Sequence, residues 1–468
     1  MQFRNLGSTG LKVSELCLGT MTFGSGFLGI GVVDQSGADA IVRRALDAGV
    51  NFFVTADVYS RGQSEELLGH ALKASGVPRH SVVVATKVRG TMSDAANDGT
   101  GDVNNRGLGR KHILESIDGS LTRLGLDYVD LYQIHGLDPT TPIEETLEAL
   151  NDVVRMGKAL FIGVSNLAAW QIERALGSSK QRAWAKFVSV QAYYSLAARD
   201  LEVEVLPMAR AEGLGVLTWS PLAGGYVSGK YRAGSPEVGR RNHFDFPQVS
   251  PHAEEALAAL EEVARERGAS MARVALAWLR HQPGVTSVII GVRDLTQLDD
   301  DLGAADLQLT PDELTRLGEA TEPELPYPHW MIARQTGAPP KRCPALRPRP
   351  DRRSAEALIV PPAPNGAPVR SGTLRPIQDV LLREPDRGQK TEDAMAHLRL
   401  VEPSIDTYGS RRAWRRHQRV ASHKAGAHAG DQERGPSLSA VALASIAILA
   451  VVVLLVLLLS QVASAFVG

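Results

Sequence analysis

A tyrosine, a lysine and a histidine stand where three apolar runs of the sequence end. Tyr59 lies in the polar loop after residues 51–54, Lys87 closes V-V-V-A-T-K, and His135 closes D-L-Y-Q-I-H. A phenol can transfer a proton to a substrate if a neighbouring group lowers its pKa from about 10. Lys87 and His135 are the candidates for that task. The three residues together predict a site of general acid chemistry.

The elements that must position these side chains alternate regularly along the chain. Short apolar runs predict strands at residues 15–18, 51–54, 82–86, 129–134, 160–164, 188–191, 216–219 and 285–290. Amphipathic spacing predicts helices at 38–46, 64–74, 111–124, 143–156, 168–176, 201–212, 252–267, 270–281, 294–302 and 311–320. Residues 322–335 are expected to form a short extension across the barrel that these elements build.

Eight strand–helix units are the number that closes a parallel sheet into a (β/α)8 TIM barrel. Residues 3–13 carry two apolar pieces around G-S-T-G and predict an N-terminal β-hairpin. Active sites of such barrels lie at the C-terminal ends of the strands. We therefore expect Tyr59, Lys87 and His135 to meet there, with residues 222–251 as a lid-like loop above the seventh strand.

The chain is long enough for one large barrel and a tail. It has 468 residues, of which 44% are hydrophobic and 22% charged. From Lys341 onward 19 Lys and Arg outnumber 11 Asp and Glu, so the preceding part is acidic. An acidic body argues against nucleic-acid binding. With only Cys17 and Cys343, a disulfide framework or a cysteine-based zinc site is excluded, which suits a reducing cytosol.

The composition changes after the barrel. Nine prolines between residues 339 and 368 predict that 336–437 is a disordered linker following the domain 1–335. Residues 438–468 carry no charge and exceed the roughly 20 apolar residues that span a bilayer. Six basic residues precede them: Arg411, Arg412, Arg415, Arg416, Arg419 and Lys424. We expect a transmembrane helix at 438–466 that anchors a cytoplasmic barrel; a buried core helix is the alternative.

One glycine motif gives a weaker signal. Residues 24–29 read G-S-G-F-L-G and fit the dinucleotide fingerprint G-x-G-x-x-G. That fingerprint should run straight into a helix, whereas Ile30 to Val33 intervene here. We interpret the segment as a flexible loop at the barrel mouth rather than a phosphate cradle.

Several motifs occur in an order and spacing that resemble the aldo-keto reductases, including the potassium-channel β-subunit branch. They are N-F-F-V-T-A-D-V-Y-S-R-G-Q-S-E-E-L-L-G at 51–69, A-T-K at 85–87, D-L-Y-Q-I-H at 130–135, G-V-S-N at 163–166, W-S-P-L-A-G-G at 219–225 and I-I-G-V-R-D-L-T-Q-L-D-D-D-L at 289–302. The likeness covers residues 2 to about 334. It implies a barrel that binds NADP(H) without a Rossmann fold and reduces the carbonyl of a small molecule.

The resemblance also implies roles for individual residues. Tyr59 would donate the proton, Lys87 would lower its pKa, and His135 would orient the carbonyl. Ser165, Asn166 and Gln191 would hydrogen-bond the nicotinamide carboxamide, and Trp219 would stack on its ring. The rest of the cofactor would meet Gly19, Thr20 and Met21, with Ser220, Leu222, Gly224 and Lys230 at the pyrophosphate and Gly291, Arg293, Gln297, Asp300 and Asp301 around the adenosine. Arg293 would favour the 2′-phosphate of NADP.

Each catalytic assignment has a structural alternative. Tyr59 could be an ordinary loop tyrosine, Lys87 a surface lysine, His135 a structural histidine and Trp219 plain barrel packing. Asp57 is interpreted as a solvated loop carboxylate rather than a catalyst.

The sequence departs from the family pattern D-T-A-x-x-Y at Val54, where the family has the aspartate that pairs with the lysine. Without that carboxylate, desolvation should lower the pKa of Lys87 and weaken its support of the Tyr59 phenolate. At Asp301 the family often has asparagine, which unlike an ionised carboxylate can donate a hydrogen bond.

Three functions follow as alternatives. The first is an NADPH-dependent carbonyl reductase, tethered to a membrane and impaired by Val54. The second is a non-catalytic NADP(H)-binding redox sensor or regulatory subunit at a membrane. The third makes Lys87 a Schiff-base nucleophile in an aldolase-like barrel.

Overall fold

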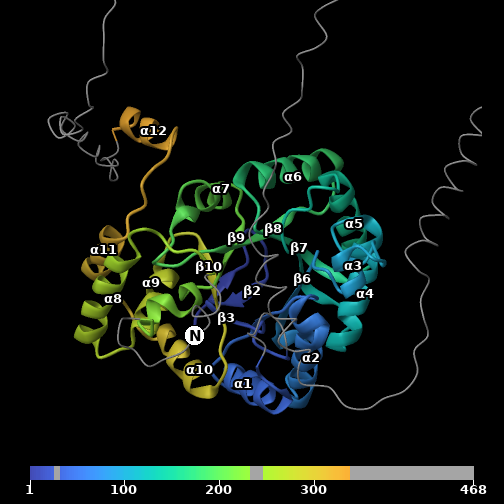
Figure 1. The fold of residues 1–468 in the computed structure, drawn as a ribbon, viewed down its shortest axis with the longest axis horizontal. Coiled ribbons are helices and arrows are strands. Elements are labelled where there is room, and N and C mark those ends of the chain that lie inside the picture. Colours follow the sequence, from blue (N-terminus) through green and yellow to red (C-terminus); the bar gives the residue numbers. More distant parts are fainter. Residues whose placement is uncertain (26–31, 232–245, 338–468) are drawn as a thin grey trace, which may run out of the picture. The chain divides into compact units, whose positions relative to one another are not determined.

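The computed structural model describes residues 1–25, 32–231 and 246–337. Eight parallel strands form a closed barrel in the order β10-β3-β4-β5-β6-β7-β8-β9, so the predicted (β/α)8 barrel is confirmed. Figure 1 shows these strands at the centre of a ring of helices. Their bounds are β3 Leu16–Gly19, β4 Phe52–Val54, β5 Val83–Val88, β6 Val129–Ile134, β7 Ala159–Ser165, β8 Phe187–Tyr193, β9 Gly215–Trp219 and β10 Val285–Ile290.

The helices around the barrel agree with the predicted ones in order, and apart from α6 and α7 nearly in length. They are α1 Gln35–Asp47, α2 Gln63–Ser75, α4 Arg110–Leu124, α5 Ile143–Arg155, α6 Ala169–Arg182, α7 Val205–Ala211, α8 Ala253–Arg267, α9 Met271–His281, α10 Leu295–Leu302 and α11 Pro311–Ala320. Two short helices lie outside the repeating pattern, α3 Asp94–Asp98 and α12 His329–Gln335. The helices of the repeating pattern, unlike α12, bury apolar residues against the barrel, as the 3.6-residue period predicts.

One predicted helix is broken. The sequence predicts a helix over residues 201–212, but the structure has a 3₁₀ turn at Asp200–Glu202 and then α7. Pro207 lacks an N–H and its ring excludes a preceding helical turn, so it is accepted only near a helix start. The helix therefore begins at Val205, two residues before the proline.

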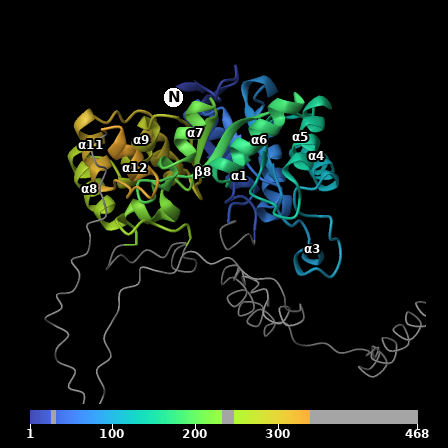
Figure 2. The same cartoon turned by 90° about the horizontal axis from the view of Figure 1, so that it is seen from above.

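The predicted hairpin is confirmed and lies against one end of the barrel. β1 Phe3–Asn5 and β2 Lys12–Ser14 pair antiparallel, and Leu6 between them is buried in the barrel interior. Gly7 sits at φ 59°, where an added Cβ would lie 2.6 Å from the carbonyl oxygens of Gly213 and Val188. Only glycine allows this approach. Figure 2 views the ring of helices from its side and shows the N terminus and α3 on opposite faces of it, so the mouth beyond β5 lies away from the hairpin.

Strand alternation divides the apolar residues into two clusters. One set packs outward against the helices, and a smaller set fills the barrel interior. The interior set contains Leu6, Val13, Cys17, Phe52, Val54, Val83, Ala85, Leu131, Val188, Leu217 and Ile289. Since alternate residues of a strand share a face, Lys87 lies on the interior face of β5 with Val83 and Ala85.

A buried ion pair fixes β3 to α9 near the start of the strand. Arg280 Nη2 lies 2.8 Å from Glu15 Oε1, and the side chains are 3% and 0% exposed. Arg4 Nη2 is 3.5 Å from the other Glu15 oxygen. Arg280 also donates to the Ala304 carbonyl at 2.5 Å, so this arginine joins three parts of the fold.

Three predicted segments fall partly or wholly outside the described residues. They are the glycine-motif loop from residue 26 to 31, the part of the lid-like insert from 232 to 245, and the chain from 338 onward, which contains most of the predicted linker and the whole predicted transmembrane helix. Within the described ranges, no helix has the length and apolar character needed to cross a membrane.

Candidate active site

Tyr59, Lys87 and His135 meet at the C-terminal ends of β4, β5 and β6. Lys87 Nζ lies 3.2 Å from the Tyr59 hydroxyl, and the Tyr59 and His135 rings contact edge to face with centroids 5.7 Å apart. The pairing register explains the convergence, because Lys87 faces Gln133 and the His135 N–H donates to the Val88 carbonyl. The expectation that the strand ends bring these side chains together is confirmed.

Tyr59 is held by an unusual turn. The two residues that follow it, Ser60 and Arg61, have φ angles of 47° and 54°. Such left-handed backbone costs about 1–3 kcal/mol per non-glycine residue and tends to occur at functional sites. The Ser60 hydroxyl donates to the Phe23 carbonyl at 3.1 Å, and Arg61 pairs with Asp94 of α3. These contacts keep the phenol directed at Lys87.

Lys87 is not a surface lysine, because only 1% of it is exposed. Its Nζ donates to the Thr55 carbonyl at 2.8 Å and contacts Tyr59, while its stem lies among the apolar interior residues. Burial lowers the pKa of Lys87 to about 7, an effect that Cys17, Asp57 and Glu65 only partly offset. The lowered pKa expected from the missing carboxylate at position 54 is therefore present.

Asp57 corrects a sequence-based interpretation. We predicted a solvated loop carboxylate, but Asp57 is fully buried. Its Oδ1 accepts the Val58 N–H at 2.6 Å, while Oδ2 has no hydrogen-bond partner among the described residues. Burial, with Glu65 adding to it, raises the pKa of Asp57 well above its usual range. A neutral Asp57 does not replace the carboxylate missing at Val54.

A buried cluster that the sequence did not reveal lies behind β5. Glu65 is fully buried, accepts the Thr86 hydroxyl at 2.5 Å and pairs with Arg123 at 2.7 Å. Thr86 precedes Lys87 on its strand, so the cluster connects α2 and α4 to the backbone that carries the lysine. The signal in the sequence was the pair of glutamates in S-E-E-L-L near the start of α2. We included these residues in the predicted helix and in the motif at 51–69 but gave Glu65 no role of its own.

His135 is a neutral imidazole over the working pH range. Burial, together with the nearby cations Lys87 and Arg89, lowers the pKa of His135 to about 3. Its carbonyl accepts the Asn166 side chain at 3.0 Å, which ties the end of β6 to the end of β7. A neutral ring can donate one hydrogen bond to a carbonyl oxygen without adding charge.

The residues expected at the nicotinamide form one polar cluster at the ends of β7, β8 and β9. Ser165 donates to the Gln191 carbonyl at 2.8 Å, and Trp219 Nε1 donates to Asn166 Oδ1 at 3.0 Å. Sequence reasoning missed Gln133, an amide on the interior face of β6 that donates to Gln191 Oε1 at 3.2 Å. Its own Oε1 is buried without a partner among the described residues. The available signal was alternation, which places Gln133 on the same face of β6 as the apolar Val129 and Leu131.

Trp219 takes part in packing as well. The ring of Tyr193 stacks on it at 4.9 Å and that of Phe246 at 5.8 Å. A nicotinamide ring that stacks on Trp219 must share or replace one of these contacts. Trp219 therefore does pack against neighbouring aromatic rings, as the alternative interpretation predicted. Its stacking on a nicotinamide ring stays a prediction.

The residues expected at the pyrophosphate lie in a tight turn after β9. Ser220 and Gly224 have φ angles of 50° and 68°, and the Gly224 N–H donates to the Ser220 hydroxyl at 3.1 Å. Leu222 is half-buried in this turn, and Lys230 follows with Nζ 5.3 Å from the Tyr231 ring centroid. Left-handed turns aim successive N–H groups to one side, a geometry suited to anions.

The residues expected at the adenosine lie before α10 and along it, with Gly291 and Arg293 ahead of the helix and Asp300 and Asp301 in its last turn. The Arg293 N–H donates to Gln297 Oε1 at 3.1 Å, and Gly291 and Arg293 are exposed. Asp300 is already paired, with the Ser270 hydroxyl at 2.5 Å and with Arg273 at 3.0 Å. Asp301 is buried, and burial together with Asp300 raises its pKa to about 7.

Gly19, Thr20 and Met21, which are expected to contact the cofactor at the end of β3, are less exposed to solvent than Gly291 and Arg293. An added Cβ at Gly19 would lie 2.6 Å from Ile289, so this glycine allows close strand packing. The Thr20 hydroxyl is buried and lies 2.8 Å from the Ser64 hydroxyl, which leaves its side chain engaged within the protein. Met21 is half-buried at the mouth.

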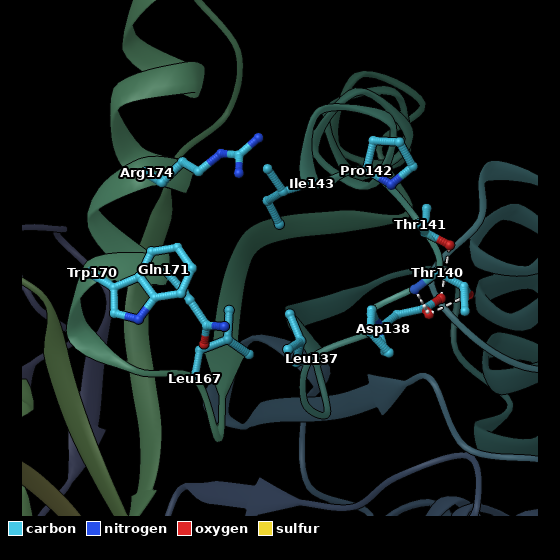
Figure 3. Close-up of a pocket in the computed structure, with 11 residues that line it drawn as sticks. Leu137, Asp138, Thr140, Thr141, Pro142, Ile143, Leu167, Trp170, Gln171 and Arg174 are labelled. Atoms are coloured by element: carbon cyan, nitrogen blue, oxygen red, sulfur yellow. Dashed lines mark hydrogen bonds between the residues drawn. The ribbon is translucent and has the colours of Figure 1, made fainter. Parts of the chain in front are cut away.

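A cavity of about 410 Å³ lies beside this site rather than in it. Figure 3 shows its walls, formed by the loop after His135 and by the start of α6. Its lining includes Leu137, Asp138, Ile143, Leu167, Trp170 and Arg174, none of which is a predicted site residue. In the part of the chain that the structure describes, no group of His, Cys, Asp and Glu is arranged to hold a metal ion.

Fold and site together define an eight-stranded barrel enzyme scaffold with a tyrosine, lysine and histidine at its mouth. The model of the aldo/keto reductase family matches residues 15–322, and the chain belongs to that family. The predicted resemblance is confirmed by this match.

The relatives include enzymes and channel subunits. The chain is 36% identical over 344 residues to versiconal hemiacetal acetate reductase of Aspergillus parasiticus, covering 70% of this chain and 99% of the relative. It is 40% identical over 323 residues to the uncharacterized oxidoreductase YrpG of Bacillus subtilis, covering 68% and 95%. It is 37% identical over 329 residues to a probable voltage-gated potassium channel subunit beta of Oryza sativa, again covering 68% and 95%.

Proposed function

We propose that the protein reduces aldehyde or ketone carbonyls to alcohols with NADPH. The observation that carries the proposal is the contact between Lys87 Nζ and the Tyr59 hydroxyl at 3.2 Å, beside a neutral His135. Membership of a family whose relatives include a named reductase supports the reaction class.

The polar cluster at the mouth fits a nicotinamide carboxamide. The orphaned Oε1 of Gln133 needs a donor, and the Ser165, Asn166 and Gln191 side chains supply donors and acceptors nearby. The left-handed turn at Ser220 to Gly224 suits a pyrophosphate, and Arg293 suits a 2′-phosphate. When bound, the cofactor would supply the hydride.

The chain's own residues handle the oxygen and its proton. His135 donates a hydrogen bond to the substrate carbonyl oxygen and so orients the carbonyl. Tyr59 gives its proton to that oxygen as negative charge develops, and charged Lys87 stabilises the resulting phenolate. Because the pKa of Lys87 is only about 7, this support weakens as the pH rises above neutrality.

The test is NADPH oxidation by the full-length protein with a panel of aldehydes and quinones, beside NADPH binding followed by fluorescence. We expect binding and turnover in the wild type, with turnover lost and binding kept in Tyr59→Phe. Absence of both binding and turnover in correctly folded wild type would refute the proposal.

A second candidate is a nicotinamide-binding regulatory subunit. Val54 favours it, because the missing carboxylate leaves Lys87 without its pairing anion, and relatives named as potassium channel β subunits add support. Retained NADPH binding without turnover in the wild type, with turnover appearing in Val54→Asp, would favour this candidate over the reductase.

We also propose that residues 438–466 anchor the protein in a membrane with the barrel in the cytoplasm. The uncharged apolar run and the six basic residues before it support this. Carbonate-resistant recovery in the membrane fraction, lost on deletion of 438–468, is the expected result; release of the intact protein by carbonate would refute it.

A further inference from the structure

Lys87 has surroundings that suit a nucleophile better than a permanent cation. Its Nζ lies at the mouth end of a strand, above the apolar cluster of the barrel interior, and the interior residue at the end of β4 is Val54, which pairs with Ala85 two residues before Lys87. A lysine becomes nucleophilic when desolvation keeps its amine neutral. We propose that Lys87 forms an imine with small aldehydes through Nζ, with Tyr59 as the proton donor.

The titratable groups around Lys87 offset only part of the effect of burial on its pKa. Cys17 on β3 is a fully buried thiol whose pKa burial raises. Asp57 is a buried acid with a raised pKa, and Glu65 is already paired with Arg123. The Tyr59 phenol also contacts Lys87, and the ring of neutral His135 packs on the far edge of that phenol without supplying a negative charge.

The consequence for protonation is large. With its pKa lowered to about 7, about half of Lys87 is the free amine at pH 7. For an ordinary exposed lysine with a pKa near 10.4 the free-amine fraction at pH 7 is only about one in 2,500. The buried amine therefore has far more of the reactive form at neutral pH.

The hydrogen bonds around Nζ also suit the reaction. A neutral amine has two N–H donors and one lone pair. One N–H donates to the Thr55 carbonyl at 2.8 Å and the other to the Tyr59 hydroxyl at 3.2 Å, so the lone pair is directed away from both partners. When a carbonyl approaches beside this pair, its carbon meets the lone pair of Nζ and its oxygen accepts the proton of the Tyr59 phenol.

The chemistry balances without an oxidant or a reductant. The Nζ lone pair forms a bond to the carbonyl carbon, the C=O π pair moves to oxygen, and Tyr59 protonates that oxygen. The nitrogen gives a proton back to the Tyr59 phenolate, which leaves a neutral carbinolamine. Tyr59 then protonates the hydroxyl a second time, water leaves, and the remaining N–H proton returns to the phenolate as the C=N bond forms.

The proposal is independent of the reductase activity, because it needs no nicotinamide. Its test is trapping with propionaldehyde and cyanoborohydride, which reduces the imine to a stable propyl-lysine. Peptide mapping of the full-length protein by mass spectrometry then reports each lysine separately. Lys111, which is exposed and pairs with Glu115, serves as the internal reference.

At pH 7 we expect Lys87 to be labelled at least about tenfold faster than Lys111. Between pH 5.5 and 8.5 the rate at Lys87 should rise and level off above about pH 7, whereas the rate at Lys111 should keep rising. Tyr59→Phe should slow the labelling of Lys87, and Lys87→Met should remove the adduct from this peptide.

Val54→Asp is the discriminating variant. A carboxylate within about 4–6 Å raises a lysine pKa by 1–3 units, so labelling of Lys87 at pH 7 should fall by about tenfold or more. Val54→Asn is the matched uncharged control and should keep the wild-type rate. Labelling confined to exposed lysines, or a rate at Lys87 without a break near pH 7, would overturn the proposal. The wild-type pH series decides the matter even if Val54→Asp fails to fold.

Discussion

Replacing Val54 with aspartate should shift the pH dependence of carbonyl reduction. Val54 belongs to the apolar barrel interior beside Lys87, whose pKa is lowered to about 7. If reduction needs charged Lys87 to stabilise the Tyr59 phenolate, activity should fall as the pH rises through about 7. A carboxylate at position 54 should raise the pKa of Lys87 by 1–3 units.

The magnitude follows from the two protonation curves. At pH 8 a lysine of pKa 7 is charged in about 9% of molecules, and a shift of about two units makes that about 90%. Val54→Asp should therefore be about tenfold more active than wild type at pH 8 and about equal to it at pH 6. The assay is kcat/KM for NADPH oxidation with one aldehyde from pH 5.5 to 9.5.

The free energy of unfolding gives a second measurement of the Lys87 pKa. It should rise with pH, whereas the activity should fall. The pKa of Lys87 is lower in the folded state than in the unfolded chain, so the unfolded state binds more protons between about pH 7 and 10. The free energy of unfolding of the wild type should thus rise over that range, by roughly 4 kcal/mol at most, and Val54→Asp should flatten the rise. Val54→Asn is the control for the change in side-chain shape, because asparagine resembles aspartate but carries no charge. Identical pH midpoints in all three proteins would refute the reasoning.

Three further predictions concern other parts of the barrel. Arg280→Met should lower the free energy of unfolding by roughly 3 kcal/mol in urea titrations because it leaves Glu15 buried and charged; adding Glu15→Gln should recover much of the loss, and no recovery would contradict this. Gly69→Ala should cost roughly 2 kcal/mol despite the better helix propensity, because its Cβ would lie 2.3 Å from the Leu124 carbonyl oxygen; an unchanged Tm would contradict the close packing. NADPH affinity measured by fluorescence should fall about tenfold from pH 6 to 8 as Asp301 ionises around pH 7, and Asp301→Asn should remove that dependence.

The sequence predicted the barrel because its signals are local and repeated. Eight apolar runs with turn residues between them, and helices of 3.6-residue period, give the strand order without knowledge of side-chain contacts. The strand-end rule then brought Tyr59, Lys87 and His135 together correctly. The helix α6 was predicted several residues short because its last residues, G-S-S-K-Q-R, are ones that the apolar pattern excludes.

The parts that could not be predicted depend on contacts between distant segments. Asp57 is polar and stands in a loop, so composition indicates exposure, yet α2 and the strand ends bury it completely. The pairing of Glu65 with Arg123 joins residues 58 positions apart and fixes α2 to α4 behind Lys87. Gln133 was missed because its place in the barrel interior depends on register, which a single strand does not reveal.

The missing carboxylate makes the charge of Lys87 depend on what binds beside it. Among the described residues, Cys17, Asp57 and Glu65 only partly offset the effect of burial on Lys87, so an anionic substrate would raise the pKa of Lys87 where a neutral one would not. A 2-oxo carboxylate such as phenylglyoxylate carries that anion next to the reacting carbonyl, and its methyl ester is the matched neutral substrate. Because the carboxylate restores the charged lysine, the loss of kcat/KM between pH 6 and 8 should be about tenfold for the ester and only about twofold for the acid. In Val54→Asp the two substrates should show the same pH dependence. If the wild type already treats acid and ester alike across this range, the charge of Lys87 does not control proton transfer from Tyr59.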